Sequence, residues 1–352
     1  INVTGNNPVL VFSFIGFATQ TVAVGNRQTV DVVMETEAAG LDEFIVTAFG
    51  ISQEKKSLGY AAQSIDAEAI TKMKQPNIVN ALQGQVAGVQ VTNSGGAPGQ
   101  SARIIIRGIN SLDPGADNQP LFVVDGVPVD NSTIESSGTP RGLSNRMADV
   151  NPNDIESMSV LKGAAATALY GVRAANGAVI ITTKKGKEGQ IRVNYSGSVG
   201  FEELNRLPKL QDEYGQGFSG EYQPTSFWPS WGAPIAEVQQ TVPDHMYQDN
   251  WNRAFNTGVQ IDNSVSISGG NEIATFYGSV GNLTQEGIIP FSTWDRTTAK
   301  LSGSVKASDK FDFSGSINFS NTGGNRVPHD RFMERMMYWS ETTDVRDYIN
   351  ED

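Results

Sequence analysis

The sequence predicts a mixed α+β domain followed by the first strands of an all-β transmembrane barrel. Short helical and strand-like segments alternate between about residues 57 and 187, a pattern typical of a compact α+β domain. After Gly189, apolar and polar residues alternate along segments of about 9–11 residues, the length of a strand that crosses a bilayer. The chain has no apolar run of about 18 residues, so it encodes no transmembrane helix.

Composition excludes several classes of protein. The 352 residues carry 38 acidic and 26 basic side chains, a net charge of −12, which is the wrong sign for binding nucleic acid. Cysteine is absent, which removes disulfides, thiolate metal sites and cysteine nucleophiles. The beginning of the chain lacks the basic and apolar regions of a signal peptide, so we expect a processed or partial polypeptide.

The first 56 residues divide into two regions. Residues 1–37 contain two strand-like runs, Val9–Phe14 and Val30–Met34, which are too short to bury a core and indicate the end of a β-sandwich. Residues 38–56 form a polar linker around a β-prone segment, 44–49. Such a segment can add as a strand to the exposed edge of a partner's sheet, and it can equally be an edge strand of the preceding sandwich.

Residues 57–187 predict the order of elements in the α+β domain. Helical spacing covers 77–86, and strand patterns cover 88–92, 102–108 and 121–126. A further strand, an Ala-rich helical turn, a glycine bend and a last strand follow between Ile155 and Lys184.

Residues 188–352 predict about five strands. In the clearest case, the apolar side chains of Phe311, Phe313, Ile317 and Phe319 alternate with polar ones. A soluble β-sandwich predicts the same alternation. The connections favour a barrel, because long ones (201–257, 283–296 and from 321) alternate with short ones (269–272 and 307–310). A barrel that encloses a domain needs about 22 strands, so we expect most of it to lie outside this sequence.

The segment Ile155–Lys184 resembles the plug-domain signature of SusC/RagA-type TonB-dependent transporters of the Bacteroidetes outer membrane. The matching positions are Leu161, Lys162, Gly163, Tyr170, Gly171, Arg173, Asn176 and Gly177. The short sequences Ile-Ile-Arg-Gly at 105–108 and Val-Val-Asp-Gly-Val-Pro at 123–128 also match this family. The resemblance implies a transporter, with no enzymatic role and no cofactor or metal, whose α+β domain plugs the barrel.

Two upstream segments extend this resemblance. Residues 10–17 look like the last strands of a carboxypeptidase-regulatory-like β-sandwich. The TonB box is expected at Asp42, Glu43, Phe44, Ile45, Val46, Thr47, Ala48 and Phe49.

Partners and function follow from the resemblance. It implies TonB, energised by ExbB and ExbD, a SusD-like lipoprotein as lid, an oligosaccharide or peptide cargo and contact with outer-membrane lipid. A dimeric transporter–lid assembly belongs to the same expectation. The implied function is TonB-dependent import of a large nutrient. An outer-membrane signal transducer and a barrel with a structural role in a larger surface complex are the alternatives.

Two groups of side chains are candidate contact sites. Arg103 and Arg107 flank an Ile triplet; the family implies that such arginines meet carboxylates of the barrel wall, and the alternative is that both face solvent. Aromatic residues gather in the first long loop, at Tyr222, Phe227, Trp228 and Trp231. They suit contact with cargo or lid, or form a small core of the loop itself.

Polar side chains elsewhere predict no catalytic or metal site. The two histidines, His245 and His329, lie far apart, which argues against zinc or a catalytic triad. The carboxylates between 113 and 130 lack the spacing of a calcium loop and are expected to be solvated.

Overall fold

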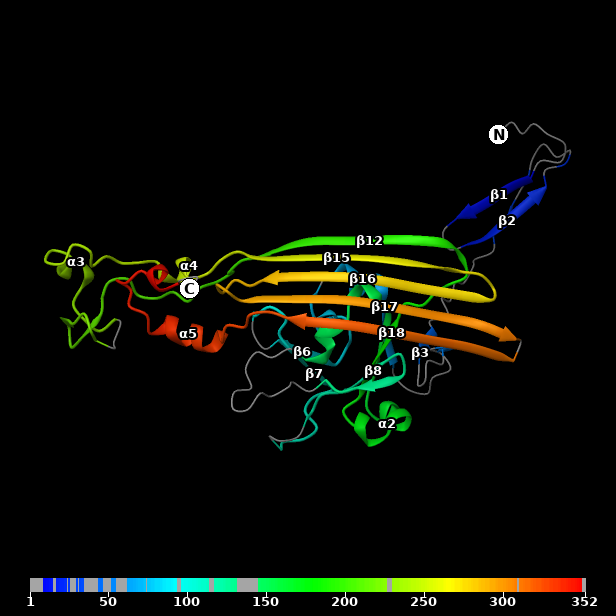
Figure 1. The fold of residues 1–352 in the computed structure, drawn as a ribbon, viewed down its shortest axis with the longest axis horizontal. Coiled ribbons are helices and arrows are strands. Elements are labelled where there is room, and N and C mark those ends of the chain that lie inside the picture. The colour runs from blue at the N-terminus through cyan, green and yellow to red at the C-terminus, as the bar shows by residue number, and fades with distance from the viewer. Residues whose placement is uncertain are drawn as a thin grey trace.

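A computed structural model describes residues 9–14, 17–23, 25, 30, 32–34, 44–46, 52–54, 62–73, 75–93, 96–113, 117–131, 145–226, 230–308 and 310–349. These residues form a short N-terminal hairpin, a mixed α+β domain and a long antiparallel sheet (Figure 1). None of the described helices is long and apolar enough to span a membrane.

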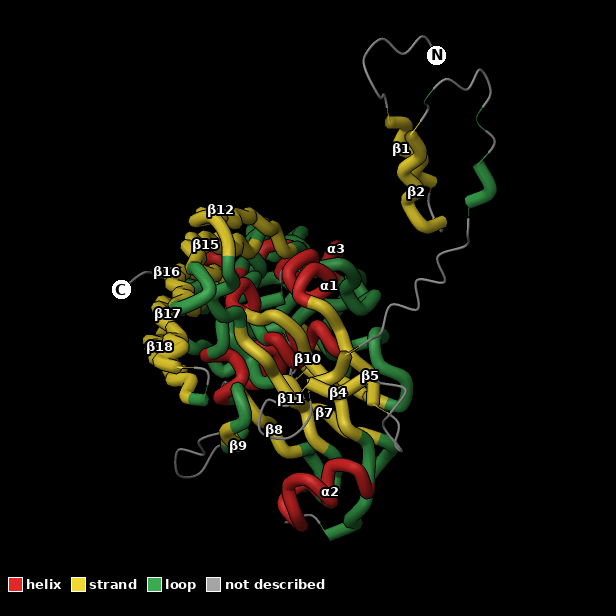
Figure 2. Tube along the Cα trace, turned by 90° about the vertical axis from the view of Figure 1, so that its right-hand side faces the viewer, coloured by secondary structure: helices red, strands yellow, loops and turns green. Residues whose placement is uncertain are grey.

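The N-terminal hairpin joins β1 (Val9–Phe14) to β2 (Phe17–Ala23) in antiparallel pairing. It stands apart from the rest of the described chain in two views (Figures 1 and 2). The prediction of a strand at Val30–Met34 was wrong, because its described residues have no strand pairing. β2 is the adjacent β-prone run, and pairing with it closes a much shorter loop than pairing with residues 30–34 would.

The α+β domain is built around a five-stranded sheet with the order β5-β10-β11-β8-β9. These strands are β5 (Ala62–Asp66), β10 (Ile155–Leu161), β11 (Ala178–Thr183), β8 (Leu121–Val124) and β9 (Val127–Val129). The hairpin of β6 (Val89–Asn93) and β7 (Ala102–Ile106) packs beside it, as do α1 (Ala67–Lys72) and the 3₁₀ helix η3 (Ile78–Leu82). Fully buried Leu82, Ile104, Phe122 and Met158 fill the core between them. The predicted strands are confirmed, and the helical spacing at 77–86 becomes one short 3₁₀ helix.

The long sheet, here called the wall sheet, has five strands that pair in sequence order. They are β12 (Gly189–Glu202), β15 (Gly258–Gly270), β16 (Ala274–Glu286), β17 (Thr293–Ser308) and β18 (Phe311–Gly323). Seen nearly along its strands, the wall sheet forms an arc beside the α+β domain (Figure 2). All its pairings are antiparallel.

The wall sheet turns its polar face toward the α+β domain and its apolar face outward. On β15, Gln260, Asp262 and Ser264 are buried, whereas Ile261 and Val265 on the opposite face are exposed. The predicted alternation is therefore confirmed, with the polar side inside. This arrangement is the reverse of a soluble sandwich, in which the apolar faces pack together.

The strand connections differ in length at the two ends of the wall sheet. One end has the short connections 271–273 and 309–310. The other has 203–257, 287–292 and the segment after β18, and the first and last of these carry the helices at the left of Figure 1. The prediction of a long connection at 283–296 was wrong, because β16 and β17 continue to pair up to Glu286 and Thr293.

Candidate functional site

The main contact between the α+β domain and the wall sheet is the segment 145–154. Two 3₁₀ turns shape it, η4 (Arg146–Asp149) and η5 (Pro152–Asp154). Asn151 caps the second turn by accepting a hydrogen bond from the Asn153 backbone N–H at 2.9 Å. Asn145 anchors the segment to its own domain by donating to the Ala102 carbonyl at 3.0 Å. These local bonds fix the backbone of the segment, so that several of its polar side chains can face the wall sheet.

Four side-chain hydrogen bonds connect this segment to four wall strands, β15, β16, β17 and β18. They join Asp149 to Thr322 (3.1 Å), Asn151 to Thr298 (3.1 Å), Asn153 to Asp262 (3.1 Å) and Asp154 to Tyr277 (2.8 Å). The approach is close: a Cβ added to Gly281 of β16 would lie 2.4 Å from the Asn151 amide nitrogen. We call the segment 145–154, together with the wall residues that it contacts, the seat.

Arg296 of β17 is the most heavily bonded cation of the seat. Its side chain is 2% exposed, and its Nη1 donates to the carbonyl oxygens of Ala148, Pro76 and Val150 at 2.7, 2.9 and 3.1 Å. Its guanidinium also lies 5.4 Å from the centroid of the Trp294 ring. These acceptors come from two separate segments of the α+β domain. A single side chain of the wall sheet therefore binds both segments.

Lys300, four residues further along β17, makes a second cationic contact. Its buried ammonium donates to the Thr183 hydroxyl and lies 3.8 Å from an Asp125 carboxylate oxygen. Asp125 in turn accepts hydrogen bonds from the backbone N–H and the hydroxyl of Thr183. Lys300 is buried and Asp125 is half-buried, so removing the carboxylate would leave the ammonium charge uncompensated.

The signature residues of the α+β domain shape the turns at the ends of its central strands. Gly163 and Gly177 have φ of 65° and 96°, and a Cβ on Gly177 would lie 2.9 Å from the Leu161 carbonyl oxygen. The Asn176 amide donates to the carbonyl oxygen of Asp117 at 2.8 Å. Gly163 and Gly171 flank α2 (Ala164–Tyr170), and Arg173 follows, exposed, in η6 (Gly171–Ala174). These positions therefore support the fold.

Arg103 and Arg107 lie elsewhere in the α+β domain. Both are exposed, and Arg107 follows the end of β7 with a φ of 60°, so the regular alternation that would place them on one face stops there. Arg107 lies near Lys162; burial and then this neighbouring charge lower the pKa of Lys162. Among the described residues, no ion pair joins either arginine to the wall sheet, and their proposed contact with wall carboxylates stays a prediction.

The segment predicted as the TonB box is described in part. Phe44–Val46 form β3, which pairs antiparallel with β4 (Ser52–Glu54). Asp42, Glu43, Thr47, Ala48 and Phe49 lie outside the described residues. A role in binding a partner therefore stays a prediction.

The predicted aromatic cluster is also described in part. Tyr222, in β14 (Glu221–Tyr222), packs edge-on against the His245 ring at 4.6 Å, and Trp231 is 66% exposed. Phe227 and Trp228 lie outside the described residues. The structure thus divides the cluster, with Tyr222 packed inside the loop and Trp231 at its surface.

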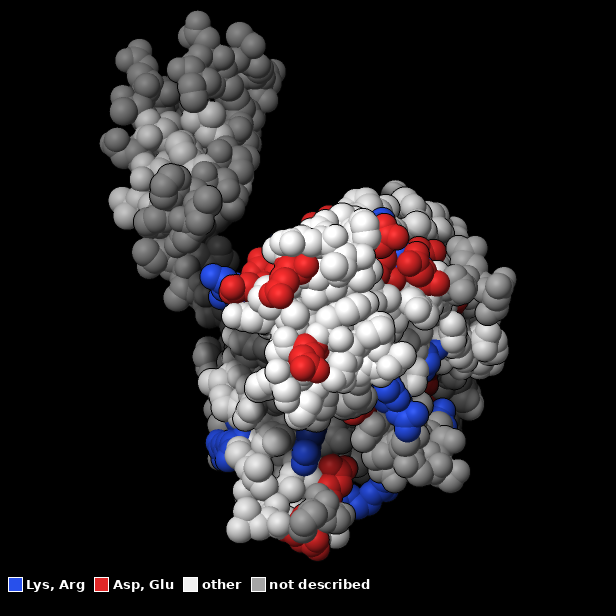
Figure 3. Space-filling view, turned by 90° about the vertical axis from the view of Figure 1, so that its left-hand side faces the viewer, with Lys and Arg blue, Asp and Glu red and all other residues white. Residues whose placement is uncertain are grey.

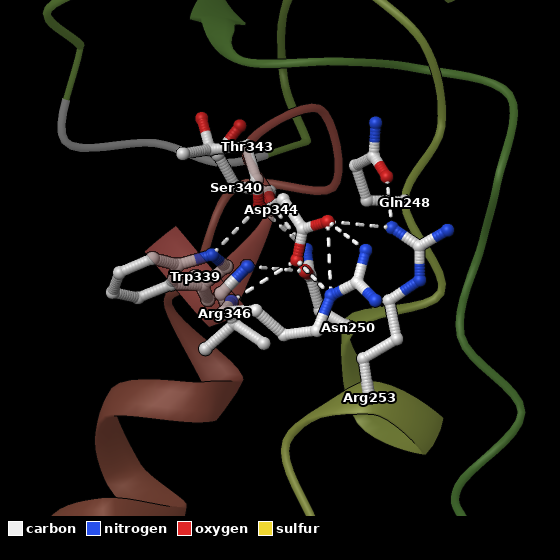
Figure 4. A network of polar contacts seen from close by, with 9 residues as sticks. Gln248, Asn250, Arg253, Trp339, Ser340, Thr343, Asp344 and Arg346 are labelled. Atoms are coloured by element: carbon white, nitrogen blue, oxygen red, sulfur yellow. Dashed lines mark hydrogen bonds and ion pairs between the residues drawn. The ribbon is translucent and has the colours of Figure 1, made fainter. Parts of the chain in front are cut away.

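A second aromatic cluster, absent from the sequence prediction, holds the long loops together. It packs Trp251 and Phe255 of the first long loop against Phe332 of α5 (His329–Met337) and against Trp339. Beside it, Asp344 binds Arg253 at 2.9 Å and Arg346 at 2.6 Å (Figure 4). Hydrogen bonds from the Arg346 side chain and then from its backbone N–H hold the pKa of Asp344 well below its ordinary value, and the charges of Arg346 and Arg253 lower it further. The two loops therefore form one ordered layer.

The face of this loop layer is mostly uncharged. Acidic side chains stand in separate groups on its upper part, and most basic ones lie below (Figure 3). His245 and His329 do not meet here: His245 is buried against Tyr222, and His329 lies 3.2 Å from the Ser292 hydroxyl. In the described part of the chain, no group of three or more His, Cys, Asp or Glu could hold a metal ion.

Comparison with known proteins identifies relatives of this arrangement. A family model described as the TonB-dependent receptor plug domain matches residues 54–178. The TonB-dependent receptor P39 of Formosa agariphila is 35% identical over 91% of this chain and 28% of its own length. The TonB-dependent receptor SusC of Bacteroides thetaiotaomicron is 37% identical over 83% of this chain and 27% of its own.

Solved structures agree with these matches. The RagAB peptide importer in its open-open state is similar over 80% of this chain and 33% of the compared chain, with 28% identity and a TM-score of 0.61. The chain thus spans about a quarter to a third of the length of the proteins that it matches. The names of these relatives are those of receptors and transporters, which supports a non-enzymatic role.

Proposed function

Because the chain belongs to the SusC/RagA type of TonB-dependent transporters, we propose that it is part of an outer-membrane importer for a large nutrient. The cargo would be an oligosaccharide or a peptide, and the α+β domain would act as the plug. One observation carries the proposal: the plug rests on the polar face of a sheet whose apolar face points outward. Polar contacts across such a seat can be exchanged for water when the plug moves.

The position of the TonB box supports an energised step. Residues 42–49 precede β5, which is the edge strand of the plug sheet and pairs only with β10 among the described strands. A pull on the box by TonB would therefore reach the plug first at this edge. The contact of Arg296 in the seat and that of Lys300 with Asp125 would resist displacement of the plug until that force arrives.

Deleting residues 42–49 is expected to abolish uptake of the cognate nutrient without changing the abundance of the transporter. A short segment at the edge of the plug is expected to contribute little to the fold and to transmit the pull. Uptake of radiolabelled nutrient and transporter abundance in outer membranes would be measured together. Replacing the same eight positions by Gly and Ser keeps the length and should give the same loss. Normal growth of the deletion strain on the nutrient would contradict energised import.

The ordered loop layer suits contact with a SusD-like lid. The layer forms at the end of the wall sheet opposite the short turns, the end that barrels of this kind place outside the cell. Its surface is mostly uncharged (Figure 3). Trp231, in the first long loop, is exposed. Tryptophan buries a large area with few rotatable bonds, which favours it as an anchor in interfaces.

Changing Trp228 and Trp231 together to Ala is expected to reduce co-purification of the lid lipoprotein about tenfold or more. The wall sheet should stay folded, because Trp231 is outside its core. A matched control is Ile273→Ala, which removes an exposed apolar side chain at the opposite end of the sheet. Unchanged pull-down and unchanged uptake in the double variant would assign these rings to the loop's own packing.

A further inference from the structure

A cavity of about 480 Å³ opens between the plug and the wall sheet, beside the seat. Its plug side comes from the turn before η3, from Asn80 in η3, from Asn93 at the end of β6 and from residues between 96 and 101. Its wall side comes mainly from the ends of β12 and β16. These strand ends lead into the connections 203–257 and 287–292. The cavity therefore lies at the end of the wall sheet that carries the loop layer.

Gln285 of β16 is the buried polar group of this cavity. It is 4% exposed, and its amide nitrogen donates to the Glu202 carboxylate at 3.1 Å, which fixes the orientation of the amide. Its Oε1 has no hydrogen-bond partner among the described residues. A buried acceptor without a partner is costly, so its presence in a cavity indicates that a donor comes from elsewhere.

Two plug residues on the other side of the cavity also have buried acceptors without a partner among the described residues. The side-chain oxygens of Asn80 and Gln100 are buried, and neither has a hydrogen-bond partner in the described chain. Asn77 and Asn93 also line the cavity, so its walls are rich in amides. Amides can both accept and donate hydrogen bonds, as the hydroxyl groups of a sugar can.

The charges of the cavity favour one kind of cargo. Glu202 and Glu203 line it, and no lysine or arginine stands among its described lining residues. An acidic sugar or the carboxylate end of a peptide would lie here without a cation and close to these two carboxylates. Such a group would lose its hydration without compensation, whereas a neutral hydroxyl would satisfy the free acceptors.

We propose that this cavity binds an uncharged oligosaccharide and excludes acidic cargo. The inference rests on the proposed import function and adds a specificity to it. Hydroxyl groups of the sugar donate to Gln285, Asn80 and Gln100. Glu202 and Glu203 repel carboxylate and sulfate groups.

Binding to the purified full-length transporter tests the proposal. Calorimetry would compare neutral hexasaccharides of glucose, xylose, mannose and fructose with hexamers of galacturonate and with a tryptic digest of casein. We expect binding within the neutral set alone. Binding confined to galacturonate or to peptides, or no binding of any neutral hexamer, would overturn the proposal.

Variants connect that binding to the cavity. Asn80→Ala and Gln285→Met should each weaken binding of the neutral sugar about tenfold, the effect of losing one well-made hydrogen bond. Asn80→Ala is expected to fold, since η3 is capped by the Asn77 side chain and by the backbone carbonyl of Asn80, not by the Asn80 side chain. Gln119→Met is the matched control, because Gln119 has an equally unpartnered oxygen outside this cavity. Equal affinity in all three variants would overturn the site.

Charge exclusion has its own test. Glu203→Gln should raise the affinity for hexagalacturonate at least tenfold, whereas Glu272→Gln, in the short turn at the other end of the sheet, should leave it unchanged. If acidic sugar binds no better to Glu203→Gln, exclusion by charge is wrong. The outcome stays distinct from that of the import proposal: uptake of an acidic cargo that requires residues 42–49 would support import and refute this site.

Discussion

Replacing Arg296 by Met is expected to loosen the plug from the wall sheet by about 3 kcal/mol. The variant removes the donor shared by the carbonyl oxygens of Pro76, Ala148 and Val150 and leaves these acceptors in a buried site. Methionine fills most of the volume, so the loss concerns hydrogen bonds and charge more than packing. Hydrogen exchange over residues 145–154 in the full-length transporter would rise, and large antibiotics would enter cells more readily.

Two further variants frame this result. Arg296→Lys keeps the charge but not the planar fork, and should give an intermediate effect. Arg192→Met removes an exposed arginine from β12 and should leave exchange in the seat unchanged. Equal protection of residues 145–154 in Arg296→Met and the parent protein would show that the seat does not depend on this side chain.

Replacing Ile317 by Arg is expected to destabilise the membrane-embedded protein by about 2–4 kcal/mol if the residue lies near the bilayer midplane. Ile317 is 72% exposed on β18 and pairs with Leu301, which is 66% exposed on the same face of the wall sheet. We propose that this face contacts lipid, where a guanidinium cannot keep its hydration. Unfolding in urea from lipid vesicles would measure the loss.

The neighbouring position supplies the control. Ser316 pairs with Ser302 on the polar face, so Ser316→Arg should be tolerated. Cysteine placed at each position would report the same difference, with Ser316→Cys open to water-soluble reagents and Ile317→Cys protected. The opposite labelling pattern would mean that the proposed lipid-facing and water-facing sides are reversed.

The sequence predicted the fold well where a pattern is periodic. Alternation identified both faces of the wall sheet, because successive side chains of a strand point to opposite faces. An apolar residue at every second position therefore marks one face, whichever way the sheet curves. The plug strands were identified for a similar reason, since buried β-branched runs end at glycine turns. Pattern alone could not say whether the apolar or the polar face packs inside. The predicted connection lengths favoured a barrel, although the connection near 283–296 is shorter than predicted, and the burial of Gln260 and Asp262 shows that the polar face packs inside.

The seat could not be predicted from the sequence in the same way. Arg296 binds backbone carbonyls of residues 76, 148 and 150, and a carbonyl has no signature in the sequence. The only signal in the sequence was a positively charged residue on the polar face of a strand. Such a residue is equally compatible with a side chain that faces solvent. Arg107 shows the converse error: strand periodicity was extended past Ile106, where the backbone turns to a positive φ.

A cleavable bridge between plug and wall tests most directly the claim that cargo passes only when the plug leaves its seat. Asp149 and Thr322 bond at 3.1 Å, and the 352 residues contain no cysteine of their own. Cysteines at these two positions, joined by a bis-methanethiosulfonate reagent, should stop uptake, and reductant should restore it. A bridge between Thr275→Cys and Ser304→Cys, both in the wall sheet, should leave uptake unchanged. Normal uptake by the bridged 149–322 transporter would contradict the account.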